Sequence, residues 1–306
     1  MPNQDSRIKL TMATDNSSVF ESIEKRAKAA TKTAEDKPAP AKVVQLPLWP
    51  EPVRAVPNGV LRSALFGAVA KGRRRFIDNQ EIAAIDGVSV VYRGDRLDQG
   101  DLDAWEAVLH AVRSQELGSE CHVSSYTLLK LMGVADTGKY RKILYNRIAR
   151  LTGGMLTLKQ GSKTYMGHLI NWAAKDEDTQ HWAIGLNPKL SALFESDQYT
   201  LIEWGVRSDL SNIQLAQWLH GFYSSHAKPF PIKIETLHKL CGSETSDMWK
   251  FAQLLRKALD ALTAAYQAHG QDFSYTINRG LVSVVREASK SQRKHLTKRG
   301  RKPKAV

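Results

Sequence analysis

YTLLKLMG (Tyr126–Gly133) and ETLHKLCG (Glu235–Gly242) are two versions of one short sequence, 109 residues apart. They share Thr, Leu, Lys, Leu and Gly at the same spacing. Each version follows a short strand-like stretch and precedes a turn and an amphipathic helix that carries basic residues. Because the surroundings match as well as the letters, we interpret the pair as a duplication of one supersecondary unit.

The residues around each copy predict the same order of elements. The first copy reads as a helix over Leu102–Ser114, a strand over Cys121–Val123, helices over Ser124–Met132 and Tyr140–Leu151, and a hairpin from Met155 to Ala173 that turns at Gly161 and Ser162. The second reads as a helix over Ser211–His226, a strand over Pro231–Ile234, a helix ending at Gly242, a helix over Met248–Leu262, and a hairpin over Phe273–Val285. This order is typical of a winged helix-turn-helix. We therefore predict an α+β fold with two tandem winged helix-turn-helix domains and flexible N- and C-terminal tails.

The predicted boundaries follow from composition. Residues 1–56 are poor in apolar periodicity and rich in proline towards their end, which indicates a flexible N-terminal tail. Residues 57–200 form the first winged-helix domain and residues 201–288 the second. Residues 289–306 form a basic C-terminal tail.

Charge and composition limit the classes of protein to which this chain can belong. The chain has 306 residues, a net charge of +13 and 42% hydrophobic residues, with no apolar run long enough to span a membrane and no secretory signal. Cys121 and Cys241 stand far apart without a metal-ligand pattern, so we expect a cytoplasmic protein with no metal or cofactor. Much of the positive charge lies in Lys290–Val306, which contains no acidic residue. Charge alone therefore does not identify the rest of the chain as DNA-binding.

The second helix of a helix-turn-helix lies in the major groove of DNA, and in the second domain this is the helix that starts near Met248. Its polar face carries donors that match guanine and adenine edges, so we predict that the bases are read by Lys250, Gln253, Arg256 and Lys257. An ordinary solvated helix face would show the same residue types. The predicted phosphate contacts are the hydroxyls and free backbone N–H groups at the helix start, the two wings and the more basic helix of the first domain: Ser243, Thr245, Ser246, Arg279, Lys139, Arg141, Lys142, Arg147 and Lys163.

The proline-rich segment before the first domain contains QLPLW (Gln45–Trp49). Ligands of the bacterial sliding clamp are short extended peptides with a glutamine followed by leucine and a paired aliphatic-aromatic end. We therefore predict clamp contacts by Gln45, Leu46, Leu48 and Trp49. The alternative is that Trp49 docks on the first domain.

No pattern in the sequence predicts an enzyme. GVADTGK (Gly133–Lys139) fits the start of a phosphate-binding loop, but Tyr140 stands where Mg²⁺ binding needs Ser or Thr, and a helix rather than a strand precedes the loop. The histidines are scattered and include no His-x-His pair of the kind that a metal-dependent nicking site uses.

Two long strings, LWPEPVRAVPNGVLRSALF (Leu48–Phe66) and FYSSHAKPFPIKIETLHKLCGS (Phe222–Ser243), resemble the TrfA-type replication initiators of broad-host-range plasmids. The resemblance extends from about Gln45 to Arg286. It implies two winged helices that bind direct repeats (iterons) in double-stranded DNA at a plasmid origin. It also implies recruitment of the host initiator protein and the replicative helicase, and self-association between monomers and dimers. The family's clamp-binding string matches at Gln45, Leu46 and Leu48 and departs at Pro47 and Trp49.

Two other functions remain open from the sequence. A transcriptional repressor would use the same two modules without a clamp ligand. A module that contacts only protein would lack the steep salt dependence of DNA binding.

Overall fold

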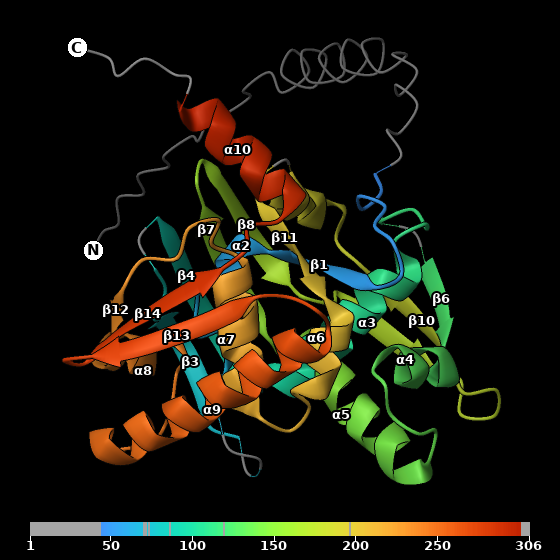
Figure 1. Cartoon of the computed structure of the whole chain (residues 1–306). Coiled ribbons are helices and arrows are strands. Elements are labelled where there is room, and N and C mark those ends of the chain that lie inside the picture. The colour runs from blue at the N-terminus through green and yellow to red at the C-terminus, as the bar shows by residue number, and fades with distance from the viewer. Residues whose placement is uncertain are drawn as a thin grey trace, which may run out of the picture. The chain divides into compact units, whose positions relative to one another are not determined.

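The second copy of the repeated sequence folds in the predicted order. The computed structural model describes residues 44–300 apart from 70, 71, 73, 86, 119 and 196. We define the second repeat unit by these elements: α7 (Gln214–Ser224), β12 (Ile232–Lys233), α8 (Ile234–Leu240), α9 (Met248–Ala268), β13 (Phe273–Asn278) and β14 (Leu281–Arg286). The three strands form an antiparallel sheet in the order β12-β14-β13. Figure 1 shows the β13–β14 hairpin alongside α9.

The first copy folds in the same way, with one correction to the predicted hairpin. The first repeat unit consists of α3 (Gln99–Val112), β6 (Glu120–Ser124), α4 (Ser125–Leu131), α5 (Gly138–Gly153), β9 (Trp172–Lys175) and β10 (His181–Gly185). Its strand order, β6-β10-β9, matches that of the second unit. The strand that pairs with β6 therefore belongs to the β9–β10 hairpin. The predicted wing over 155–173 was wrong.

The residues of the predicted wing join a different sheet. β7 (Met155–Gln160) and β8 (Lys163–His168) do pair around Gly161. The other edge of β7 pairs with β4 (Val88–Asp95), and β4 pairs with β3 (Phe76–Ile82). Together they form a four-stranded sheet of order β3-β4-β7-β8. The first unit thus carries an extra sheet, built from segments that precede α3 and follow α5. A local turn signal identified the hairpin but not its partner strand.

The two copies of the repeated string end their helices identically. Gly133 and Gly242 take φ of +68° and +61°, the left-handed region that glycine enters without a steric penalty. The next residue's N–H reaches back to the carbonyl five positions earlier, from Val134 to Leu129 and from Ser243 to His238. Both helices therefore end in a Schellman motif, which explains why glycine stands at the same place in each copy.

The remaining elements tie the chain together. β1 (Val53–Pro57) pairs with β11 (Tyr199–Glu203), and β2 (Phe66–Gly67) pairs in parallel with β5 (Leu97–Asp98). The short helices are α2 (Asn58–Leu61), η1 (Pro188–Phe194) and α6 (Trp204–Asp209). Helices and strands mix throughout, so the predicted α+β class is confirmed.

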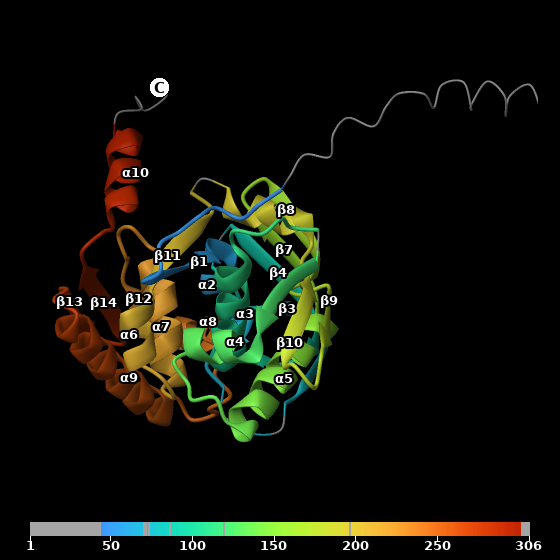
Figure 2. The same ribbon diagram turned by 90° about the vertical axis from the view of Figure 1, so that its right-hand side faces the viewer.

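The hydrophobic core consists of two clusters, one drawn from residues 46–202 and one from residues 206–284. Figure 2 shows the first repeat unit on the right and the second on the left, with α3 and α7 in contact. Buried Arg207, from α6, joins the two. Its Nε lies 2.7 Å from Asp103 Oδ1 and 3.3 Å from Glu106 Oε2, both on α3. Charged groups are rarely buried unless paired, and here the pairing links α6 to α3 of the first unit.

Both predicted tails need correction where the structure describes them. Residues 1–43 and 301–306 lie outside the described residues, but residues 44–56 are folded and contribute β1 and core side chains. The basic C-terminal segment forms α10 (Lys290–Gly300). Ser289 and Gln292 start this helix reciprocally, since each backbone N–H bonds to the other's side chain. Such a capping box stabilises a helix start.

Candidate nucleic-acid interface

α9 presents one long exposed face to solvent. The helix begins at Asp247, whose carboxylate accepts hydrogen bonds from the N–H groups of Trp249 and Lys250. The helical period of the sequence predicts a buried stripe of Phe251, Leu254, Leu255, Ala258, Leu259 and Leu262. All of these side chains are buried except Leu254, which is 42% exposed, so the prediction was wrong for that residue. Because these residues fix the rotation of the helix, the predicted base readers Lys250, Gln253, Arg256 and Lys257 all lie exposed on the other side.

The exposed face of α9 is cationic. From Met248 to Leu259 the helix contains Lys250, Arg256 and Lys257 and no acidic residue. The first acid is Asp260, whose Oδ1 accepts a hydrogen bond from Tyr275 of β13 at 2.6 Å. None of the three cations forms an ion pair within the part of the chain that the structure describes. A polyanion can therefore approach this face without displacing an internal partner.

Trp249 belongs to the same face, and sequence reasoning missed it. Its side chain is 71% exposed, the most of the seven tryptophans. The signal was present, since Trp249 stands four residues before Gln253 and seven before Arg256, on one stripe of the helix. Tryptophan suits a core equally well, so periodicity alone did not assign it.

The turn before α9 differs in detail from its prediction. The carboxylate of Asp247 accepts from the N–H groups of Trp249 and Lys250, so these two groups are not available to a phosphate, which corrects the reason given for this site. Ser243 Oγ accepts from the N–H of Thr245. Ser246 is exposed, whereas Ser243 and Thr245 are half-buried. Ser246 is therefore the hydroxyl of this turn best placed for an external contact.

The β13–β14 hairpin puts Arg279 at its turn. Arg279 has φ of +46° and is followed by Gly280 at +77°, as in a type I′ turn. Asparagine and glycine take this conformation readily, but a long side chain pays a penalty. Arg279 is exposed and forms no ion pair among the described residues.

Three of the predicted phosphate contacts of the first unit already lie against other residues of the chain. Arg141 pairs with Asp136 at 2.6 Å, and half-buried Arg147 lies against Gly100 of α3. Lys163 lies in β8, where it pairs with Glu195 at 3.2 Å, and so is not a wing residue. Lys139 and Lys142 are exposed, so both side chains are accessible for the phosphate contacts predicted from the sequence.

QLPLW is not a free peptide. Leu46 and Trp49 are 3% and 5% exposed, and the Trp49 ring stacks on Phe194 at a centroid distance of 6.3 Å. Trp49 Nε1 donates to His110 Nδ1 at 2.9 Å. Gln45 is exposed and donates to the Ser114 carbonyl, and Leu48, at 74% exposed, projects into solvent. The segment is part of the first core, as the alternative interpretation held.

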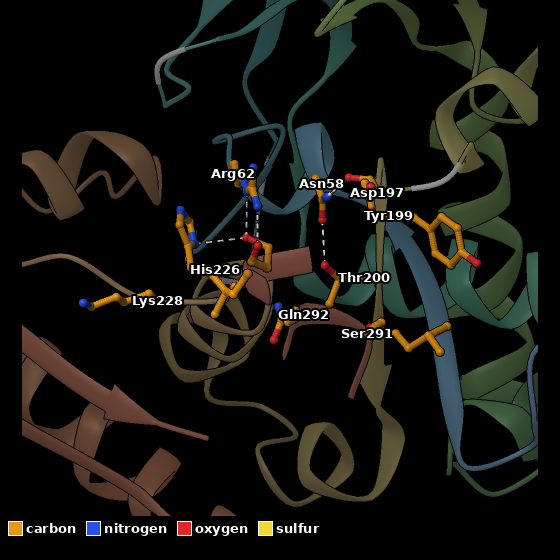
Figure 3. Close-up of a pocket in the computed structure, with 13 residues that line it drawn as sticks. Asn58, Arg62, Asp197, Tyr199, Thr200, His226, Lys228, Ser291 and Gln292 are labelled. Carbon is orange, nitrogen blue, oxygen red and sulfur yellow. Dashed lines mark hydrogen bonds between the residues drawn. The ribbon is translucent and has the colours of Figure 1, made fainter. Parts of the chain in front are cut away.

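Other candidate sites give little support for a function. A pocket of about 520 Å³ lies against α10. Several of its polar groups bond to one another: Arg62 Nε donates to Ser225 Oγ, and Thr200 Oγ1 donates to Asn58 Oδ1 (Figure 3). GVADTGK connects α4 to α5, so the strand that a phosphate-binding loop needs is absent from this described stretch. The described residues include no group of side chains arranged to hold a metal ion. No helix among them is long and apolar enough to cross a membrane.

Comparison with known proteins identifies the family. The family model described as TrfA protein matches residues 19–270, most of the chain. The chain belongs to the TrfA family. The plasmid replication initiator protein TrfA of Escherichia coli is 27% identical over 222 residues, which cover 70% of this chain and 58% of the relative. RepFIB replication protein A of Salmonella typhi is 22% identical and covers 55% of each chain.

The TrfA-family chain spans a little over half the length of these curated relatives. Among solved structures, domains 2 and 3 of RctB match with a TM-score of 0.47 and 13% identity, covering 74% of this chain and 96% of that one. Of the two curated relatives, TrfA is a plasmid replication initiator protein and the RepFIB relative is a replication protein.

Proposed function

We propose that this chain is a plasmid replication initiator that binds direct repeats (iterons) in double-stranded DNA through two winged helices. Family membership supports the initiator role. The exposed cationic face of α9, flanked by the β13–β14 turn, is the observation that carries the DNA-binding part.

The two repeat units support the winged-helix assignment. Each has a helix, a strand, two further helices and a hairpin whose second strand pairs with the first strand. In the second unit this assignment makes α9 the helix that enters the major groove and the β13–β14 hairpin the wing. Arg279 then reaches a phosphate, which accounts for an arginine where the backbone favours asparagine or glycine.

The first unit has a supporting role in this proposal. With Arg141 and Lys163 paired internally, Lys139 and Lys142 are left for the backbone of the DNA. Contact with phosphates adds affinity without sequence preference. The same proposal includes self-association into dimers, recruitment of the host initiator and helicase, and a cytoplasmic location in the bacterial host. Family membership supports these parts of it.

Clamp binding is a separate proposal with a physical condition. QLPLW can enter a pocket on the sliding clamp only if Leu46 and Trp49 leave the first core. That release has a cost in folding free energy, so any clamp affinity should rise when the first core is loosened.

The test of the proposed function is selection of bound sequences from random double-stranded DNA. An initiator should enrich one motif repeated in the same orientation, with binding that weakens steeply as salt rises. A palindrome would favour the transcriptional repressor instead. Failure to retain any DNA would favour a module that contacts only protein, and would overturn the proposal.

A further inference from the structure

The exposed face of α9 divides into a central stripe and a flank. At 100° per residue, Trp249, Gln253 and Arg256 fall on one line directly opposite the buried stripe. Lys250 and Lys257 stand one position further round, on one flank. If the helix enters a groove, the central line faces its floor and the lysines face one wall.

Trp249 is the apolar member of that central line and stands at its beginning. Its backbone N–H donates to Asp247 Oδ1 at 2.8 Å, so the capped first turn fixes the backbone position from which the ring projects. A tryptophan offers a large apolar surface that is normally buried. Here that surface remains in solvent among Lys250 and Arg256, which makes an apolar protein partner a poor fit.

The major groove has one feature that suits an apolar ring among cations. Phosphates attract the lysines and Arg256, while the C5-methyl group of thymine is the apolar group on the base-pair edges. We propose that Trp249 packs against a thymine methyl group and so sets a thymine in the recognised sequence. This inference rests on the proposed function and deepens it.

The spacing on α9 limits where that thymine lies. Trp249 and Gln253 are separated by about 6 Å along the helix axis, which is nearly two base-pair steps of about 3.4 Å. The amide of Gln253 suits adenine. The methyl group that Trp249 contacts should therefore lie within two base pairs of the position that Gln253 reads.

The experiment replaces each thymine of the selected binding site by deoxyuridine, which removes only the methyl group. Dissociation constants are measured for the wild type, Trp249→Ala and Leu254→Ala. Leu254 is the matched control, because it is exposed on the same helix but lies off the central stripe. One deoxyuridine at the contacted position should weaken wild-type binding about fourfold. This factor corresponds to the free energy gained when one methyl group is removed from water. Trp249→Ala should bind both DNAs equally, while Leu254→Ala keeps the wild-type difference.

Three results would overturn the inference, and they differ in whether the proposed function survives. If the wild type binds a specific site but no thymine methyl matters, or if Trp249→Ala stays equally sensitive, Trp249 does not read thymine and the proposed function stands. If the wild type selects no sequence at all, both fall. Trp249→Ala should melt within about 1 °C of the wild type, since an exposed side chain contributes little to stability.

Discussion

Truncating Trp49 should unfold the protein at much lower temperature. Its ring is buried against Phe194 and its Nε1 donates to His110 Nδ1 at 2.9 Å. Burial lowers the pKa of His110, which keeps Nδ1 unprotonated and able to accept that bond. Trp49→Ala therefore removes both a large packed surface and a buried hydrogen bond.

The magnitude follows from the size of the side chain. Truncation of a buried tryptophan costs about 3–5 kcal/mol. For a folding unit of about 150–250 residues, Tm changes by about 2–4 °C per kcal/mol, so Tm should fall by about 6–20 °C. Arg54 Nη1, 3.1 Å from His110 Nδ1, can take over the lost hydrogen bond, so the loss is mainly one of packing.

Differential scanning calorimetry of Trp49→Ala beside Leu48→Ala gives the assay. Leu48 is the neighbouring residue and is exposed, so its truncation should change the free energy of unfolding by less than about 0.5 kcal/mol. Equal melting of both variants and the wild type would refute the placement of Trp49 in the core. It would also restore QLPLW as a free peptide.

Three further perturbations test other parts of the structure. Burial raises the pKa of Glu106 to about 7 from 4.5. The protonated carboxyl therefore contributes its full stability below about pH 4.5, and that contribution is lost as pH rises through 7. Glu106→Gln should reduce the fall in Tm between about pH 5 and pH 8, and an unchanged fall would contradict the burial of Glu106. Arg279→Gly should relieve the strain of the positive φ and raise the free energy of unfolding by up to about 1 kcal/mol. The same variant should weaken DNA binding. Unchanged DNA affinity would show that Arg279 does not contact the DNA. Gly242→Ala should destabilise more than Gly133→Ala. A Cβ at 242 would meet Arg96, whereas a Cβ at 133 would meet only Ser208 Oγ, at an ordinary contact distance of 3.7 Å. The reverse order in urea denaturation would argue against the contact with Arg96.

Local signals predicted much of the second unit. The buried stripe of α9, the turn around Arg279 and the glycine after α8 are all encoded within a few residues, by helical period and turn chemistry. The same signals predicted α4 and its cap at Ser124. The four predicted base readers were placed on the exposed face for the same reason.

Long-range pairing was beyond the reach of those signals. β6 pairs with β10 across some sixty intervening residues, while the nearer hairpin around Gly161 had the clearer turn pattern and was chosen as the wing. β1 pairs with β11 across a still longer interval, and its register buries the segment that prolines had marked as a linker. Which ions pair internally, as Arg141 does with Asp136, also depends on contacts that a residue pattern does not contain.

The most direct test of α9 as the reading helix compares specific and non-specific DNA binding in one variant. Lys250→Ala, Gln253→Ala and Arg256→Ala combined should lower affinity for the selected site by about 1–3 kcal/mol for each side chain that contacts a base. Affinity for random DNA should fall much less, since backbone contacts elsewhere remain. Lys139→Ala with Lys142→Ala, on α5, is the contrasting variant and should lower both affinities alike. If the α9 variant also lost specific and non-specific affinity equally, α9 would not be the element that reads the DNA sequence.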